Sequence, residues 1–171
     1  MKKVIILIAT LLISATMIFA GTYSGGDGLV GNPYQINDLD DLEELSGNVS
    51  DWDMLFIQTA DINAGATSGW NSGSGFSPIG NNSTSFTGEY DGQGHTIDSL
   101  YINRSTTNYI GLFGCVSGAV IDSIGLTNVD ITGGDYYVGS LVGYNRNFST
   151  ITNSYSTGSV SAGNYVGGLV G

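Results

Sequence analysis

The chain has 171 residues, and its composition excludes several classes of partner. Lysine and arginine together number 4 against 15 aspartate and glutamate residues, which gives a net charge of −11. Binding to nucleic acid or to an anionic membrane surface needs a basic face, which such a chain cannot supply. The single cysteine excludes an internal disulfide, and the 41% hydrophobic content argues against disorder of the whole chain.

Residues 1–20 predict a signal peptide. Lys2 and Lys3 precede an apolar run over residues 4–19, and Ala20 precedes a polar stretch. The run is shorter than the roughly 20 residues that span a bilayer, so an uncleaved anchor is the second interpretation. Cleavage would leave no transmembrane segment and only Arg104 and Arg146 as cations, for a net charge of −13 (2 − 15). We therefore expect an exported protein, either secreted or held at the cell surface.

Residues 21–55 predict an N-terminal cap with one short helix over about residues 38–46. Asn37 or Asp38 suits the N-cap position, and Gly47 suits the helix end. Three leucines spaced three apart give the helix one apolar face, which must be buried against another element. We expect this helix to cover the open end of a strand array. The leucines are Leu39, Leu42 and Leu45.

Seven carboxylates gather in and after this predicted helix. Carboxylate oxygens bind Ca²⁺, but the spacing fits neither an EF-hand nor a glycine- and aspartate-rich nonapeptide repeat. We predict the solvated face of the helix and no cofactor, with Ca²⁺ binding as the alternative. The seven are Asp38, Asp40, Asp41, Glu43, Glu44, Asp51 and Asp53.

Residues 56–171 contain a repeated element. Tyrosine followed by Ile or Val and then Gly occurs at Tyr109, Tyr137 and Tyr165, so the copies start 28 residues apart twice (137 − 109 and 165 − 137). Each copy continues into a Leu-[Phe/Val]-Gly sequence. A fixed period of this size is typical of repeat architectures, in which each unit buries its apolar face on a neighbour. Because the third copy ends at Gly171, we expect a C-terminally truncated fragment with further repeats or domains beyond it.

A second repeated element lies between these copies. Ile-Asp-Ser-Leu begins at Ile97, Ile-Asp-Ser-Ile begins at Ile121, and a fainter copy begins at Ile151. We expect these three isoleucines to form one inward ladder, and Leu100 and Ile124 to form part of another. Two or three short strands per unit predict an all-β chain, a right-handed parallel β-helix or solenoid with an N-terminal capping helix.

These residues resemble a known family. Gly111-Leu112-Phe113-Gly114 and Gly168-Leu169-Val170-Gly171 look like the GLUG motif of bacterial surface and secreted repeat proteins, named for its Gly-Leu-any-Gly core. Residues 140–143 are similar through Leu141 and Gly143 but have Ser140 in place of the first glycine. The resemblance, which covers roughly residues 30–171, implies a β-helix-like extracellular module without a catalytic signature in the repeat. It also implies attachment, in some members, to adhesins or secreted peptidases.

The catalytic candidates are Asp98 and Asp122, which occupy equivalent positions in the second element. On adjacent coils their carboxylates would lie about 5 Å apart, close to the separation in retaining glycosidases. The alternative is an outward polar position after a buried isoleucine, and the third copy has Thr152 there. We therefore predict no enzyme activity. His95 and Cys115 have no partner of their own type, so we interpret them as a turn residue and a packing residue.

Tyrosines supply the binding candidates. Aligned on one face of a solenoid, they would either contact a glycan or a protein, or stack only on one another between coils. The sequence leaves both open. The binding candidates are Tyr101, Tyr109, Tyr137, Tyr144, Tyr155 and Tyr165, and Tyr136 belongs to the same set of repeat tyrosines.

Together these features predict a non-catalytic, exported repeat protein. It would act as an adhesion or binding module for an extracellular glycan or protein, or as a structural spacer. The alternative is an accessory region of a larger secreted peptidase or glycoside hydrolase whose catalytic domain lies beyond residue 171.

Overall fold

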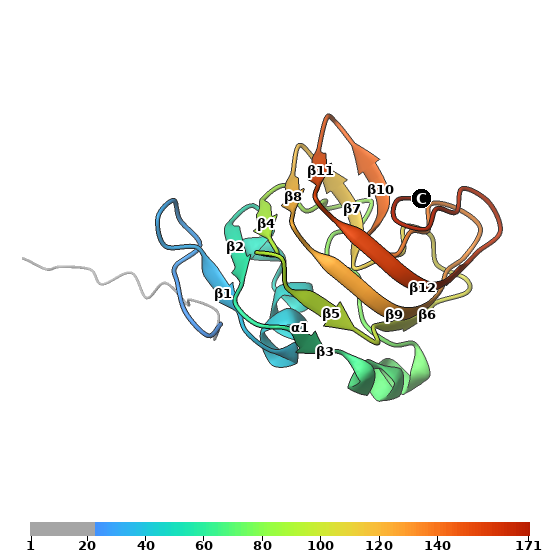
Figure 1. Ribbon diagram of the computed structural model, residues 1–171. Helices are drawn as coiled ribbons and strands as arrows, with labels where there is room; N and C mark the ends of the chain where they lie inside the picture. Colours follow the sequence, from blue (N-terminus) through green and yellow to red (C-terminus); the bar gives the residue numbers. More distant parts are fainter. Residues whose placement is uncertain (1–22) are drawn as a thin grey trace, which may run out of the picture.

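A computed structural model describes residues 23–171 (Figure 1). The predicted signal peptide lies outside these residues. Within them the chain is rich in strands and has a single α-helix, which confirms the all-β class. None of the helices in this range is long and apolar enough to cross a membrane.

The chain passes repeatedly over the same three faces, and each pass is called a rung. A lead-in segment precedes four rungs, which cover residues 55–86, 89–117, 120–146 and 150–171. The lead-in contains β1 (Tyr34–Ile36), α1 (Leu39–Gly47) and the 3₁₀ helix η1 (Val49–Asp51). The first rung contains β2 (Leu55–Gln58), β3 (Ile62–Asn63) and the 3₁₀ segment η2 (Gly65–Gly73). The second contains β4 (Glu89–Asp91), β5 (Thr96–Asp98), β6 (Tyr101–Asn103) and β7 (Phe113–Ser117). The third contains β8 (Val120–Asp122), β9 (Gly125–Thr132) and β10 (Val142–Arg146), and the fourth contains β11 (Thr150–Thr152) and β12 (Tyr155–Ser161).

The strands form three separate sheets, and all pairs between named strands are parallel. The first sheet has the order β1-β2-β4-β8-β11, the second pairs β7 with β10, and the third has the order β3-β5-β9-β12 with β6 also on β9. Each rung therefore adds its strand next to that of the preceding rung. Figure 1 shows β1 at one end of this stack and β11 and β12 at the other.

One inward ladder runs through the first sheet. It starts at Tyr34 and Phe56 and continues through Tyr90, Ile121 and Ile151, each aligned with the next. The predicted stacking of Ile121 on Ile151 is therefore confirmed. The ladder is aromatic in its first three members and aliphatic in the last two.

The predicted placement of Ile97 in this ladder is wrong. Ile97 lies in β5 of the third sheet, where it pairs with Ile62 and Leu126. The two Ile-Asp-Ser segments resemble each other because both turn a corner after a buried isoleucine, but they turn different corners. Leu100 is also misplaced, because the next residue, Tyr101, pairs with Asp130 and not with the residue after Ile124.

The N-terminal part of the core is built mainly from aromatic rings. Phe56 lies 5.7 Å from Tyr23, 5.5 Å from Tyr34 and 6.1 Å from Phe86, measured between ring centroids. Phe86 lies 5.0 Å from Phe113 in the next rung. Edge and tilted contacts of this kind contribute about 0.5–1.5 kcal/mol each beyond the area that they bury.

Helix α1 forms where the sequence predicts it, with Asp38 as its N-cap. The Asp38 carboxylate accepts hydrogen bonds from the backbone N–H groups of Asp40 and Asp41, both at 3.1 Å. Leu42 and Leu45 are fully buried, and the helix contacts β1. The Trp52 indole donates to the Leu45 carbonyl at 2.8 Å, so the end of the helix is tied to the segment that enters the first rung.

Candidate functional site

Three tyrosines from successive repeats stack into a ladder. The centroid of the Tyr137 ring lies 5.2 Å from that of Tyr109 and 5.3 Å from that of Tyr165, with interplanar angles of 14° and 9°. These separations are close to the ~4.8 Å between neighbouring strands, so the stacking of the rungs sets the spacing of the rings. The residue after each tyrosine joins a parallel bridge, Ile110 to Val138 and Val138 to Val166.

Each ladder tyrosine has a left-handed backbone. The φ angles are 62° at Tyr109, 62° at Tyr137 and 49° at Tyr165. This conformation costs a bulky side chain roughly 1–2 kcal/mol relative to the right-handed region. All three copies make the same turn, and it places the three rings in one column. Ring stacking of about 0.5–1.5 kcal/mol per pair offsets this cost.

Two more tyrosines flank the ladder. Tyr144, from β10, lies 4.6 Å from Tyr137 and 5.8 Å from Tyr109, both tilted. Tyr136 lies 5.9 Å from Tyr165 and 6.3 Å from Tyr137. The five rings are called the tyrosine cluster: Tyr109, Tyr136, Tyr137, Tyr144 and Tyr165.

The cluster is only partly open to solvent. Tyr136 and Tyr165 are exposed, at 42% and 63%, whereas Tyr109, Tyr137 and Tyr144 are half-buried. Desolvation, followed by the neighbouring tyrosines, raises the pKa of Tyr137. Both faces of the Tyr137 ring lie against other rings, so a sugar cannot stack on it. Among the described residues, the Tyr165 ring contacts only the rings of Tyr136 and Tyr137.

Two of the predicted binding tyrosines lie elsewhere. Tyr101 lies in β6, and Tyr155 begins β12. The Tyr155 ring covers Gly125, where an added Cβ would lie 2.6 Å from the tyrosine Cζ. The structure thus gathers four of the six predicted tyrosines and adds Tyr136. Tyr136 directly precedes Tyr137 in the sequence, and this position is the signal that could have added it to the binding candidates.

The two catalytic candidates do not meet. Asp98 pairs with Thr127, and Asp122 pairs with Asp91 on one side and Thr152 on the other. The expected stacking of Asp98 on Asp122 is therefore wrong. As for Ile97 and Ile121, the two residues lie in different sheets. Each carboxylate instead accepts hydrogen bonds from the rung that follows it.

These hydrogen bonds form a corner clasp. Asp98 accepts from the hydroxyl of Thr127 at 2.6 Å and the amide of Asn128 at 2.7 Å, and Ser99 donates at 2.8 Å. The hydrogen bond from Thr127 is the main reason that the pKa of Asp98 is lowered.

Asp122 repeats the clasp one rung later. It accepts from Thr152 at 2.6 Å, Asn153 at 2.9 Å and Ser123 at 3.0 Å. Its pKa is also lowered, first by the hydrogen bond from Thr152. Two carboxylates held ionised by three side-chain donors each lack the raised pKa of a general acid.

The acidic segment near α1 is less solvated than predicted. Asp41 is buried and accepts from the backbone and hydroxyl of Ser24 and from the backbone of Asn37. Asp51 is also buried and accepts from the Tyr23 hydroxyl at 3.2 Å. Burial raises the pKa of Asp51, although the hydrogen bond from Tyr23 opposes this. Within residues 23–171, no three or more His, Cys, Asp or Glu side chains lie close enough together to hold a metal ion.

His95 and Cys115 occupy separate environments. His95 Nδ1 lies 3.3 Å from the Asp61 carboxylate, and that carboxylate also accepts from the backbone of Thr96. Cys115 is buried in β7, where the Ser85 hydroxyl lies 3.3 Å from its sulfur. His95 lies in the turn between β4 and β5, as predicted, and Cys115 lies in β7 of the second sheet.

Several glycines of the repeat lie where backbone segments approach closely, although Gly168 has nothing within 4 Å of an added Cβ. A Cβ at Gly139 would lie 2.4 Å from the Val142 carbonyl oxygen and 2.7 Å from that of Leu169. Leu112 and Leu141 are fully buried, and Leu169 is partly buried. The predicted motif residues are Gly111, Leu112, Gly114, Leu141, Gly143, Gly168, Leu169 and Gly171.

Strand-rich rungs that repeat with the same tyrosine and glycine turn define a repeat protein. Residues 134–161 match the GLUG motif. The chain therefore carries a GLUG motif, and the resemblance predicted from its sequence is confirmed.

Two curated proteins are similar over most of the chain. One is named halomucin, from Haloquadratum walsbyi, and is 41% identical over 152 residues, which are 85% of this chain and 2% of that protein. The other is named as a Gly-rich membrane protein of Evansella cellulosilytica and is 31% identical over 138 residues, which are 78% of this chain and 15% of that protein. The chain thus spans a small part of either relative. No solved structure matches it.

Proposed function

We propose that this chain is a non-catalytic structural module of a surface-associated repeat protein, in which stacked rungs form a spacer. The tyrosine cluster carries the proposal, because its repeated rings contact one another across rungs. The names of the two relatives, halomucin and a Gly-rich membrane protein, favour association with a surface. A leader at residues 1–20 would bring the chain there.

The finer architecture that we propose is a right-handed parallel β-helix with α1 closing its first end. Parallel pairing and the addition of strands in rung order within each sheet support the helix. The burial of Leu42 and Leu45 beside β1 supports the cap. In such a solenoid each rung contacts only its neighbours, so length can be added without a new fold.

The absence of catalysis is also part of the proposal. The corner clasps at Asp98 and Asp122 support structural roles for both carboxylates, since each joins one rung to the next. We also propose that folding needs no cofactor. A calcium titration that raised the melting temperature would contradict this.

Adhesion is the second candidate function. The exposed rings of Tyr136, Tyr155 and Tyr165 favour it, because aromatic rings at a surface stack on sugars and pack against proteins. A role as the accessory region of a larger hydrolase is compatible with either candidate.

A glycan and matrix-protein array tests the choice between spacer and adhesin. The mature chain, residues 21–171, is compared with a variant that carries Tyr136→Ser and Tyr165→Ser. The spacer function predicts no binding above background for either protein. Binding by the mature chain that the double variant loses would overturn the spacer function and establish adhesion through the tyrosine cluster.

A further inference from the structure

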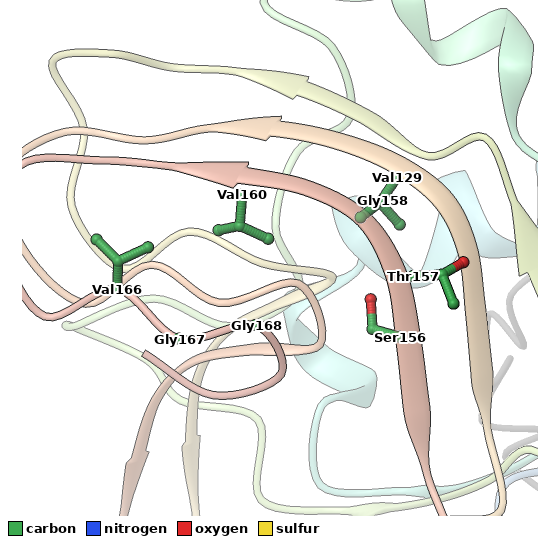
Figure 2. A pocket seen from close by; sticks show the side chains of 8 residues that line it. All are labelled: Val129, Ser156, Thr157, Gly158, Val160, Val166, Gly167 and Gly168. Carbon is green, nitrogen blue, oxygen red and sulfur yellow. The ribbon is translucent and has the colours of Figure 1, made fainter.

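Two hollows on the described part of the chain differ in their lining. The one in Figure 2 lies between β12 and the turn at Gly167 and Gly168, and its lining has neither a charged side chain nor an aromatic ring. The other, of about 350 Å³, opens between the segment around η1 and the loop before β4, and its lining includes Trp52 and Asp53. Small-molecule sites typically combine apolar surface with a few placed polar groups, as this second hollow does. It is called the cap hollow.

The cap hollow lies at a corner that is joined differently from the later corners of the stack. At the later corners the Asn147 side chain donates to the Ser117 hydroxyl at 2.8 Å, so side chains connect successive turns. At the first corner, the Thr87 and Gly88 backbone N–H groups donate to the Trp52 carbonyl at 2.8 and 2.9 Å. Because the backbone makes this connection, the side chains beside it are left to line a hollow.

Both walls of the cap hollow are held in place. The Trp52 side chain is 4% exposed and its indole N–H already donates to the Leu45 carbonyl, so its ring offers the hollow only carbon atoms. Val49, which is 48% exposed, adds to this apolar surface. In the other lining segment, the Arg146 guanidinium donates to the Ser85 hydroxyl at 2.7 Å. Walls that are positioned before a ligand arrives lower the entropic cost of binding.

Three polar side chains of the lining have no hydrogen bond of their own. They are the Asp53 carboxylate and the hydroxyls of Thr84 and Thr87, all of them exposed and without a hydrogen-bond partner within residues 23–171. A carboxylate accepts short, charge-assisted hydrogen bonds from two neighbouring hydroxyls, and a threonine hydroxyl both donates and accepts. A ring that carries adjacent hydroxyl groups and has an apolar face matches this set.

The charges around the cap hollow disfavour an acidic ligand. Its lining contains no basic side chain. Burial is the main reason that the pKa of Asp51 is raised, and the nearby charges of Glu44 and Asp53 add to this effect. Negative charge therefore gathers beside the hollow, and a ligand with a carboxylate or sulfate group would be repelled.

We propose that the cap hollow binds one neutral sugar ring, with adjacent hydroxyls of the sugar on Asp53 and Thr87 and its apolar face against Trp52 and Val49. The volume of the hollow lies near the lower end of the roughly 300–1,000 Å³ found for small-molecule sites, which suits a single ring. A ligand with so few atoms binds with a dissociation constant in the millimolar range.

This site goes beyond the proposed spacer function and uses no residue of the tyrosine cluster. A spacer that contains it would also hold a glycan at its capped end. A complex this weak dissociates while an array is washed, so the array still tests the tyrosine cluster alone. The sugar site needs a measurement at equilibrium in solution.

Amide-resolved NMR of the mature chain, residues 21–171, provides that measurement. The probes are methyl α-D-glucopyranoside, methyl α-D-mannopyranoside and methyl β-D-galactopyranoside, each added to about 100 mM so that a millimolar site approaches saturation. At least one of them should shift the signals of residues 49–53 and 84–87 in a saturable way. Sodium glucuronate, the acidic counterpart at matched ionic strength, should bind about tenfold more weakly or not at all.

Two variants test the assigned contacts. Asp53→Asn should weaken sugar binding about tenfold or more, because it removes the charge-assisted hydrogen bonds. Thr87→Tyr should abolish binding by filling the hollow, and the exposure of Thr87 leaves room for the larger side chain outside the core. Asp130→Asn removes an exposed carboxylate outside the lining and is the matched control, which should bind as the original chain does. The melting temperature of each variant shows whether it is folded.

Three results would overturn the proposal. The first is no saturable shift with any of the three neutral sugars, and the second is a set of shifts that omits residues 49–53 and 84–87. The third is unchanged binding in folded Asp53→Asn and Thr87→Tyr, since the sugar would then lie elsewhere. Binding of glucuronate as tight as that of the neutral sugars would contradict the assignment of ligand class.

Discussion

The two ends of the stack use the same strand geometry but differ in how their apolar residues are covered. At the first end, Leu42 and Leu45 of α1 are fully buried, and Phe56 is 1% exposed. At the last end, Val166 is 43% exposed although its partner Val138 is fully buried. The comparison teaches that a rung's position in the stack, and not its own sequence, decides how much each inward residue contributes to stability.

The largest expected effect comes from truncating an inward residue at the covered end. Phe56→Ala removes a ring in contact with three other aromatic rings and should cost about 3–5 kcal/mol in the free energy of unfolding. Val166→Ala at the open end should cost less than about 1 kcal/mol, because the side chain is already half in water. Urea unfolding of both variants measures the difference. Equal losses would contradict the comparison.

Glycine positions give the next largest effect. A Cβ at Gly139 would lie 2.4 Å from the Val142 carbonyl oxygen, so Gly139→Ala should force the backbone apart at a cost of about 1–3 kcal/mol. Gly168 is the matched control, since a Cβ there has nothing within 4 Å. Thermal unfolding of the two variants should show a lower melting temperature for Gly139→Ala only. An unchanged melting temperature in Gly139→Ala would mean that the backbone around Gly139 is less closely packed than described.

The tyrosine cluster should give a smaller difference. Tyr137→Leu removes two stacked contacts and two tilted ones, whereas Tyr165→Leu removes one of each. At about 0.5–1.5 kcal/mol per aromatic pair, the first variant should be the less stable of the two. Near-ultraviolet circular dichroism should also lose more tyrosine signal in Tyr137→Leu. A greater loss in Tyr165→Leu would argue against a central position for Tyr137.

The smallest expected effect is the loss of stability at low pH that comes from the two corner clasps. The lowered pKa values of Asp98 and Asp122 mean that their contribution is fully present above the unfolded value of about 3.9 and is lost as pH falls through the folded values. Stability should therefore fall below about pH 4. The pKa of Asp51 is raised, so its contribution to stability depends on pH in the opposite sense. Asp51 is present in every variant compared, and its contribution therefore cancels in the comparison.

Melting temperatures between pH 7 and pH 2 measure this contribution. The double variant Asp98→Asn and Asp122→Asn should lose stability at neutral pH and show a flatter acid dependence than the original chain. Asp130→Asn is the control, because Asp130 is exposed and its side chain makes no hydrogen bond within residues 23–171. Parallel curves for the double variant and the original chain would rule out the clasps as the source of acid sensitivity.

Much of the local structure could be predicted from the sequence. Asp38, the leucine spacing and Gly47 predict α1 to within one residue, since capping and amphipathic spacing are local properties. The 28-residue spacing of Tyr109, Tyr137 and Tyr165 predicts three equivalent turns, and the structure places them in one column.

Pairing between rungs was harder to predict. The similarity of the segments at Ile97 and Ile121 reflects two corners with the same local chemistry, and corner chemistry does not specify which sheet a strand joins. The true partner of Ile121 in the preceding rung is Tyr90, which is chemically unlike it. An inward position accepts any large apolar side chain, so the same residue type in two rungs is a poor guide to which residues pair.

The register itself can be tested most directly by disulfide formation. In the described pairing, Val120 of β8 faces Thr150 of β11, which places their Cα atoms about 4.8 Å apart, within the range for a disulfide. With Cys115 replaced by serine, the pair Val120→Cys and Thr150→Cys should form an intramolecular disulfide under mild oxidation. The pair Val120→Cys and Thr152→Cys, displaced by two residues, should not. Efficient closure of the displaced pair, or failure of the aligned pair in a folded protein, would contradict the parallel stacking of the rungs.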